Sequence, residues 1–592
     1  MLTRREFLRR SGLVAAASAV PAVTSAARAA LAATPEELER ARSLSTLART
    51  IIRGGKVHEG THGAYYRLQY GPGEPHVRRI ELANRLAPAG DPFFSFVHAC
   101  DNQLADVQSP ARVEFLDRFN DQACSPMPFS AAFRPQEALG VQEIEQMNRT
   151  LRKVRVGPVT GDPLRFTMFT GDNLDNAQLN ELRWFIDLMD GGATVAGNSG
   201  GPDFEGVQSA DWLIPTGVPD PHYWHPDPVD DKFKSMWGFP DYPGLLQAAI
   251  QPFRATGLGM PWLQVLGNHD SLLQGNAPEN PAFEAIATGP LKVVHPDPAI
   301  DPCNVLEAYL ITPESAFSGP ANPVTPDPQR ATLNRRGYIA EFFRTSGRPV
   351  GHGFTPANLQ SGRGYYHIDY RDSIRFISLD TVNPGGFAAG SIGAAQLAWL
   401  EQRLIEAHST YLAEDGTQVS TGNRDRLVIL FGHHASGELN NPVIIPNPFD
   451  LADNDLPRIF GDEVLALLHR FPNVIAWFSG HTHRNEIQPR PDPARRTNGF
   501  WEVTTASQCD WVIQTRTVEI VKNGDGTISI WCTMIDHDAP ADPRGATGIP
   551  RLASIHRELS ANDPHGGYDS GGYGARTDRN VELVVRAPAW FR

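Results

Sequence analysis

Five short apolar runs recur along this chain, and each one ends at a polar motif. The runs are rich in β-branched and aromatic residues and are bounded by Gly, Asp or His. Apolar runs of this length predict strands that are buried on both faces. They span residues 94–99, 166–170, 262–266, 427–431 and 474–478. The pattern therefore predicts a layered α/β protein.

The segment before the first run is predicted to hold one helix and one hairpin. Thr34 and Pro35 indicate a helix start, and Gly54-Gly55 its end. Residues 65–70 and 76–82 flank a Gly-Pro-Gly turn and predict a hairpin. Later in the chain we expect helices at 176–189, 396–407 and 463–470, a hairpin at 364–370 and 374–379, strands at 500–505, 516–521 and 527–534, and an apolar run at 581–585.

Gly- and Pro-rich stretches suggest how these elements are grouped. We expect an N-terminal segment at residues 30–92, a main domain at 93–538 and a C-terminal extension at 539–592. Two long insertions, at about 191–241 and 271–362, interrupt the main domain. Long connections of this kind are often lids or binding loops.

Composition indicates a globular protein with a large core, because 41% of its 592 residues are hydrophobic. The formal net charge of −14 argues against a protein that binds a nucleic-acid polymer. Five Cys form no C-x-x-C pair. Cys100 is expected to be buried, and Cys509 and Cys532 could pair across neighbouring strands.

The N-terminus carries a pattern typical of export. Residues 3–10 read Thr-Arg-Arg-Glu-Phe-Leu-Arg-Arg, followed by a short apolar stretch and Ala27-Arg28-Ala29. This resembles a twin-arginine signal peptide at residues 1–29, with an organellar transit peptide as the alternative. The prediction is export by the twin-arginine machinery to a periplasmic, cell-wall-associated or extracellular location, with no transmembrane segment.

The polar motifs that follow the five runs contain side chains of the types that bind metals in proteins. Carboxylate, amide and imidazole groups at the carboxyl ends of such strands would meet at one edge of the fold. Together they could hold two divalent cations. The motifs are Asp101-Asn102-Gln103, Gly171-Asp172-Asn173-Leu174-Asp175, Gly267-Asn268-His269-Asp270, Gly432-His433-His434 and Gly480-His481-Thr482-His483.

In their order, these motifs resemble the blocks of the calcineurin-like metallophosphoesterase superfamily, which run D-x-H, G-D-x-x-D, G-N-H-D/E, H and G-H-x-H. The resemblance covers residues 94 to 538, roughly. It implies a four-layer α/β/β/α double-sheet sandwich with long loop insertions. Gln103 departs from the usual His, and an amide oxygen favours Mn, Fe or Mg over Zn, although the identity of the two metals stays open among these four.

The resemblance also implies a role for each residue. Asp172 bridges the two cations, and His269 acts as acid or oxyanion stabiliser, with Asp175 orienting its ring or capping the following helix. His433 is favoured over His434 as a ligand, and His434 could contact substrate. The first metal takes Asp101, Gln103, Asp172 and His483, and the second takes Asp172, Asn268, His433 and His481.

The predicted function is an exported phosphoesterase in which a metal-bridging hydroxide attacks a small phosphate mono- or diester. The alternative is a metal-containing binding protein without turnover. In the first insertion, His222, Trp224 and His225 could line the substrate entrance or be plain surface groups. A basic cluster at Arg335, Arg336 and Arg344 could bind an anion or form a solvated face.

Overall fold

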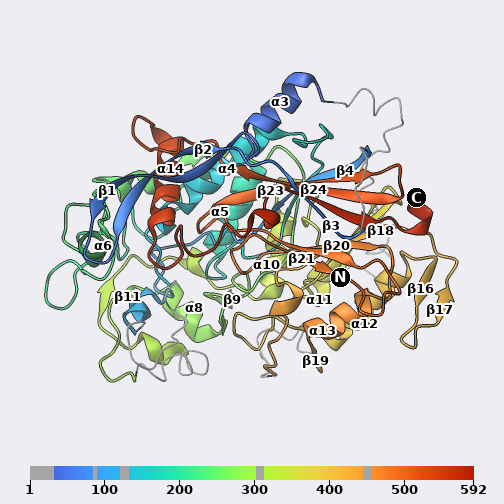
Figure 1. The fold of residues 1–592 in the computed structure, drawn as a ribbon. Helices are drawn as coiled ribbons and strands as arrows, with labels where there is room; N and C mark the ends of the chain where they lie inside the picture. The colour runs from blue at the N-terminus through green and yellow to red at the C-terminus, as the bar shows by residue number, and fades with distance from the viewer. Residues whose placement is uncertain (1–32, 84–89, 120–131, 302–312, 445–455) are drawn as a thin grey trace, which may run out of the picture.

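Two large β-sheets and their flanking helices form the body of the protein (Figure 1). The computed structural model describes residues 33–83, 90–119, 132–301, 313–444 and 456–592. The expected signal segment at 1–29 lies outside these residues, as do Cys124 and Cys303. The predicted α/β class is confirmed.

A seven-stranded sheet carries the first three of the predicted runs. Parallel pairing joins β4 to β5 and β5 to β8, whereas β23 runs antiparallel to both β4 and β24. Both the N-terminal segment and the C-terminal extension add a strand to this sheet. Its order is β3 (Val77–Leu82), β25 (Val581–Arg586), β24 (Thr527–Asp536), β23 (Gln514–Lys522), β4 (Asp91–Ala99), β5 (Thr167–Phe169) and β8 (Trp262–Gln264).

A six-stranded sheet carries the last two runs. Four of its strands, β14, β18, β20 and β22, are parallel, and the predicted hairpin of β13 and β14 is confirmed. The sheet order is β13 (Tyr366–Tyr370), β14 (Ile374–Ser378), β18 (Leu427–Phe431), β20 (Val474–Ser479), β22 (Phe500–Thr504) and β21 (Glu486–Arg490).

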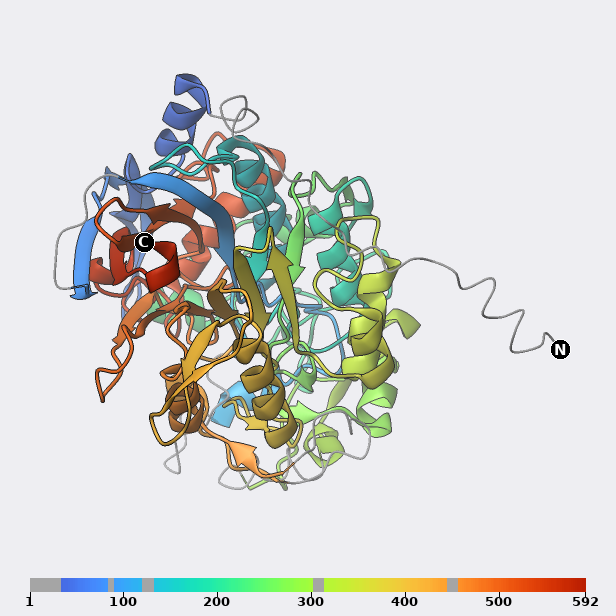
Figure 2. The same ribbon diagram turned by 90° about the vertical axis from the view of Figure 1, so that its right-hand side faces the viewer.

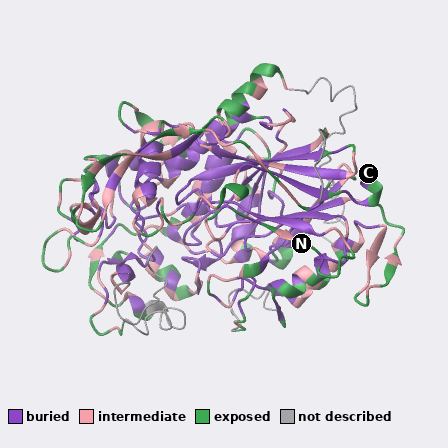
Figure 3. Cartoon of the chain, viewed as in Figure 1, coloured by how far each residue is buried: buried purple, intermediate pink, exposed green. Residues whose placement is uncertain are grey.

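The central strands bury both faces, which explains their nearly continuous apolar sequence. On β4, Phe94 and Phe96 enter a core cluster shared with the six-stranded sheet, whereas Val97 and Ala99 face a second cluster with helices. On β18, Leu427, Ile429 and Phe431 enter the shared cluster, and the residues between them face α12 and α13. The central strands of both sheets are accordingly buried (Figure 3).

Helices cover these strands through their apolar faces (Figure 2). The predicted helices are present with shifted ends, since the second motif's helix begins at Leu179. Longer helices are α4 (Gly140–Val154), α5 (Leu179–Asp190), α12 (Ala394–Ile405), α13 (Gly461–Leu468) and α14 (Gly548–Asn562). Short ones are α6 (Lys232–Trp237), α7 (Leu245–Ala249), α8 (Pro281–Ala287), α10 (Arg335–Glu341) and α11 (Pro356–Ser361).

Short two-stranded pairs decorate the connections between these elements. They are β6 (Thr194–Val195) with β7 (Phe253–Arg254), β9 (Leu272–Leu273) with β10 (Ala277–Pro278), β11 (Leu291–Val293) with β12 (Ala321–Pro323), β15 (Ile392–Gly393) with β19 (Arg458–Ile459), and β16 (Thr410–Leu412) with β17 (Gln418–Ser420). No helix among the described residues has both the length and the apolar character needed to cross a bilayer.

Two predictions for the N-terminal segment are wrong. The helix starts at Thr34 as expected, with a capping box, but α3 (Pro35–Ser43) ends early and β1 (Arg49–Glu59) follows. β1 pairs with β2 (Ala64–Pro72), and β3 pairs instead with β25. The β-branched run at residues 50–52 favours a strand, and the Gly-Pro-Gly turn connects strands of different sheets.

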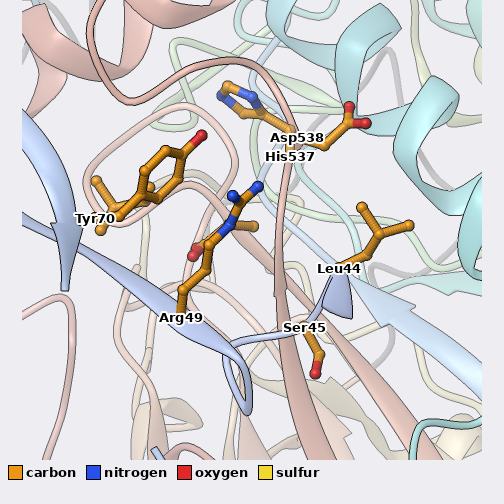
Figure 4. A pocket seen from close by; sticks show the side chains of 8 residues that line it. Leu44, Ser45, Arg49, Tyr70, His537 and Asp538 are labelled. Atoms are coloured by element: carbon orange, nitrogen blue, oxygen red, sulfur yellow. The ribbon is translucent and has the colours of Figure 1, made fainter. Parts of the chain in front are cut away.

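The start of β1 packs against the end of β24. The Arg49 guanidinium lies 4.0 Å from the centroid of the Tyr70 ring, and both residues line a small cavity with His537 and Asp538 (Figure 4). Burial lowers the pKa of His537 far below its usual range, so its ring stays neutral. Cys509 and Cys532 are both free thiols, and the expected pairing is wrong.

Candidate metal centre

All five motif loops lie at the carboxyl ends of parallel strands and bond to one another. The Asp101 N–H donates to the Gly171 carbonyl at 3.1 Å, and the Gln103 N–H donates to the Asp172 carbonyl at 2.8 Å. The Gly480 N–H donates to the His433 carbonyl at 2.9 Å. These backbone bonds join neighbouring loops within each sheet, and the His481 backbone N–H, which donates to the Asp101 carboxylate, links the loops of the two sheets into one rim.

The rim brings the predicted ligand side chains together around two buried carboxylates. His433 Nε2 lies 3.2 Å from Asp172 Oδ2, and His483 Nε2 lies 3.5 Å from Asp101 Oδ1. Gln103 Nε2 is 3.4 Å from Asp172 Oδ2, and the His481 N–H is 3.1 Å from both Asp101 oxygens. Groups this close repel or share protons unless a cation lies between them.

Several donor atoms are oriented as metal ligands require. His433 Nδ1 bonds to the Thr170 carbonyl at 2.8 Å and His483 Nδ1 bonds to Asp510 at 2.7 Å, which leaves each Nε2 facing a carboxylate. Asn268 donates from Nδ2 to the Gly275 carbonyl. The buried His433 Nε2 and Asn268 Oδ1 atoms have no hydrogen-bond partner among the described residues. The donor set therefore fits divalent cations.

In the metal-free site one of the predicted ligands holds a proton that a metal ion would have to displace. Burial disfavours a charged His433, but the Asp172 carboxylate overrides it and raises the pKa of His433 to about 9. Burial and the His433 charge lower the pKa of His481 to about 3. Metal binding must therefore release the His433 proton, which makes affinity fall at low pH.

Of the two adjacent histidines, His433 has the available nitrogen. Both ring nitrogens of His434 are engaged, with the Thr381 hydroxyl at 2.7 Å and the Ala388 carbonyl at 2.8 Å. Although His433, His434 and His481 lie within metal-binding distance of one another, His434 is already satisfied by protein groups. We therefore favour the His433 assignment.

Five of the seven predicted ligands have strained backbones. Non-glycine residues rarely adopt the left-handed region, and such strain gathers at functional sites. The loops also pack closely, because a Cβ at Gly267 would lie 2.2 Å from both the backbone nitrogen and Oδ1 of Asp172. The φ angles are 50° for Asp101, 37° for Gln103, 52° for Asp172, 72° for His481 and 55° for His483.

Gln103 points its amide toward the carboxylates with the nitrogen in front. Its Oε1 accepts from the Cys509 thiol at 3.3 Å, and its Nε2 lies 3.4 Å from His483 Nε2. An NH₂ group cannot bind a cation, whereas an amide oxygen can. Rotating the Gln103 amide by 180° places Oε1 toward Asp172, where it can serve as a metal ligand. Cys509 then accepts a hydrogen bond from Nε2.

Asp270 organises two motif loops, a role that sequence reasoning missed although the residue stood in the third motif. It is fully buried, and its carboxylate accepts hydrogen bonds from four backbone N–H groups. The donors are Gly267 at 2.8 Å, Asp172 at 3.0 Å, Asn173 at 2.9 Å and Leu174 at 3.2 Å. Asp270 thus ties the loop that carries Asp172 to the loop that carries Asn268.

Asp175 orients His269 through its backbone and not chiefly through its carboxylate. The His269 Nδ1 atom lies 2.7 Å from the Asp175 carbonyl oxygen and 3.7 Å from Oδ1. Because a carbonyl only accepts, the His269 Nδ1 carries a proton and Nε2 remains for chemistry. Asp175 lies outside α5, whose N-cap is Gln178, so the capping role is wrong.

A buried network of charges connects the two sides of the site. Arg112 contacts Glu114 at 2.9 Å, Glu137 at 2.6 Å and Asp175 at 2.5 Å. Arg134 lies 3.2 Å from Asp510, which holds His483. Burial opposes ionisation, yet these arginines hold the pKa of Asp175 and Asp510 below the usual range. Removing one partner of such a pair costs about 3–5 kcal/mol.

The insertion residues lie elsewhere. His225 is buried, with its ring nitrogens at backbone carbonyls, and Trp224 packs in a core cluster, so neither is an entrance group or a surface group. His222 lies near Lys232. Arg335 is buried against Asp380 at 2.8 Å, and Arg344 pairs with Glu341. The pocket at the metal ligands includes none of these residues.

Comparisons with known proteins add little to this geometry. No protein-family model matches the chain, and no curated protein matches it. Nine solved chains do match, and among them is a dimetal phosphatase from Danio rerio with a TM-score of 0.32 and 12% identity. The match covers 76% of this chain and 100% of that one. At this level of likeness neither fold nor function transfers.

Asp270→Asn should weaken binding of Mn²⁺ by about 10–100-fold, because an amide cannot accept from four N–H groups and loosens both loops. Titration calorimetry of the metal-free protein measures the affinity. Asp372→Asn, a change of the same kind at an exposed surface pair, serves as control. Equal affinities of the two variants would contradict this role for Asp270.

Proposed function

We propose that this protein is a metal-dependent phosphoesterase, and that its two sheets and flanking helices form a four-layer α/β/β/α sandwich. The carrying observation is the set of seven donor side chains gathered from five strand ends, with Asn268 Oδ1 and His433 Nε2 buried and without a hydrogen-bond partner among the described residues. Structural side chains normally satisfy such atoms. Their availability supports a site built for cations.

The assignment of ligands follows the observed contacts. Asp172 lies between the two groups, since its Oδ2 is 3.2 Å from His433 Nε2 and 3.4 Å from Gln103 Nε2, while its Oδ1 accepts from the His269 backbone N–H at 2.8 Å. Asp101, Gln103, Asp172 and His483 would hold one cation, and Asp172, Asn268, His433 and His481 the other. When bound, two divalent cations supply an activated water and offset charge on the phosphoryl oxygens.

His269 would supply the proton for the leaving group. Its side chain lines the pocket beside Asp172 and Asn268, and its Nδ1 is fixed by the Asp175 carbonyl. In its imidazolium form, Nε2–H can donate to the departing oxygen. The buried Arg112 keeps the Asp175 loop in place, so the ring keeps its direction.

A panel assay tests this function. Metal-free protein is reloaded with Mn²⁺, Fe²⁺, Zn²⁺ or Mg²⁺ and offered p-nitrophenyl phosphate, bis-p-nitrophenyl phosphate and nucleotides. Wild type should hydrolyse at least one class, and Asp172→Asn should lose turnover and most bound metal. The exposed Asp415→Asn is the control. Metal binding without turnover in every arm would favour a binding protein instead.

His269→Ala should lower kcat by about 10²–10⁴-fold while both metals are retained. The loss should be smaller for p-nitrophenyl esters, because their leaving groups need little protonation. Metal analysis and kcat for good and poor leaving groups measure this, with the exposed His58→Ala as control. Equal losses for all leaving groups, or a lost metal, would show a purely structural role.

We also propose export by the twin-arginine route, on the pattern of residues 3–10. The double variant Arg4→Lys, Arg5→Lys keeps the positive charge but removes the paired guanidinium groups. Fractionation should find it inside the cell, whereas Arg9→Lys, Arg10→Lys should be exported. Undiminished export of the first variant would reject this route.

A further inference from the structure

The C-terminal extension forms one wall of the metal pocket. His565, Gly566, Ser570 and Gly572 line it together with His269 and Ala388. The first four belong to a glycine-rich loop after α14, which we call the 565–572 loop. The sequence reads His-Gly-Gly-Tyr-Asp-Ser-Gly-Gly. Asp101 and Asp172 are separated from this wall by more than half of the chain.

The wall is held in place by specific contacts. The Tyr568 ring stacks on Trp511 at a centroid distance of 5.3 Å, and the Asn485 N–H donates to the Gly572 carbonyl at 3.1 Å. A Cβ at Gly572 would lie 2.3 Å from the Trp511 carbonyl oxygen and 3.3 Å from that of His483. The loop therefore packs directly on the backbone of a ligand residue.

Arg484 places an exposed guanidinium group at the metal pocket. It follows the ligand His483 and lines the pocket. Within the described residues its guanidinium makes no ion pair. By contrast, Arg134, the other arginine of the pocket, is buried 3.2 Å from Asp510.

The acidic groups of the wall are already compensated. Asp510 contacts Arg134 and His483, and Asp569 contacts Arg53 at 3.1 Å. Among the described arginines that line the pocket, Arg484 therefore keeps a positive charge that no carboxylate pairs with. A guanidinium presents a planar fork that matches a phosphate or a carboxylate.

We propose that Arg484 and the 565–572 loop form a subsite for a second anionic group, so that preferred substrates are phosphoesters bearing a further phosphate or carboxylate. This inference rests on the proposed function. The cations would bind the scissile group, and Arg484 would read the distal anion. Such a subsite selects substrates that have a negative charge at a distance from the scissile bond.

Paired phosphonates test the subsite by calorimetry on manganese-loaded protein. Carboxyethylphosphonate is compared with propylphosphonate, and carboxypropylphosphonate with butylphosphonate, so that each pair differs by a carboxylate in place of a methyl. Wild type should bind at least one carboxylate partner about tenfold more tightly. Arg484→Gln should remove this preference and leave alkylphosphonate affinity within about twofold, and Arg484→Lys should keep part of it.

Arg576→Gln is the matched control, because Arg576 is exposed in the same terminal segment and lies outside the pocket lining. The subsite is overturned if wild type shows no higher affinity for the carboxylate ligands, or if Arg484→Gln loses affinity equally for both members of a pair. In either case, binding of alkylphosphonates leaves the phosphoesterase proposal standing. Failure of the metal-loaded protein to bind any phosphonate contradicts both proposals.

Discussion

Burial of both faces of the central parallel strands is the constraint on which the site depends. Strands such as β4 and β18 place alternate residues in two different core clusters, so a polar side chain along their length costs free energy unless it is hydrogen-bonded. Polar residues accordingly gather where the strands end. Parallel pairing then puts those ends at one edge, and the loops bond to each other there.

Electrostatic compensation makes this edge possible. Asp101 and Asp172 are fully buried and close to three imidazoles, an arrangement that costs free energy unless charges offset one another. Asp270 accepts hydrogen bonds from four backbone N–H groups. Arg112 pairs with Asp175, which contacts His269, and Arg134 pairs with Asp510, which contacts His483. The strained φ angles of the ligand residues persist because this surrounding structure fixes them.

The pocket that results is built from distant parts of the chain. Its floor comes from loops after β4, β5, β8 and β20, and one wall comes from the loop after α14. The strand that follows this loop, β25, pairs with β24 and β3 in the seven-stranded sheet, and this pairing anchors the chain after the loop. The C-terminal residues are thus part of the same body as the metal ligands.

The sequence by itself determined the strands and the polar residues at their ends. Apolar runs bounded by Gly, Asp or His are local signals, and they located β18 at its observed bounds and placed Asp101, Asp172, Asn268, His433 and His481 directly after their strands. It also located the β13–β14 hairpin, since a tight antiparallel turn depends on neighbouring residues.

Only the tertiary structure decided which distant segments meet. The Gly-Pro-Gly turn after β2 looked like a hairpin, yet β3 pairs with β25 because strand partners are chosen by long-range packing. The roles of Arg112, Arg134 and Asp510 had no local signal, because ion pairs between remote residues leave no periodic pattern. Likewise, Thr381 and Ala388 occupy both ring nitrogens of His434, which leaves His433 as the available ligand. Only the folded chain brings these two residues to the His434 ring.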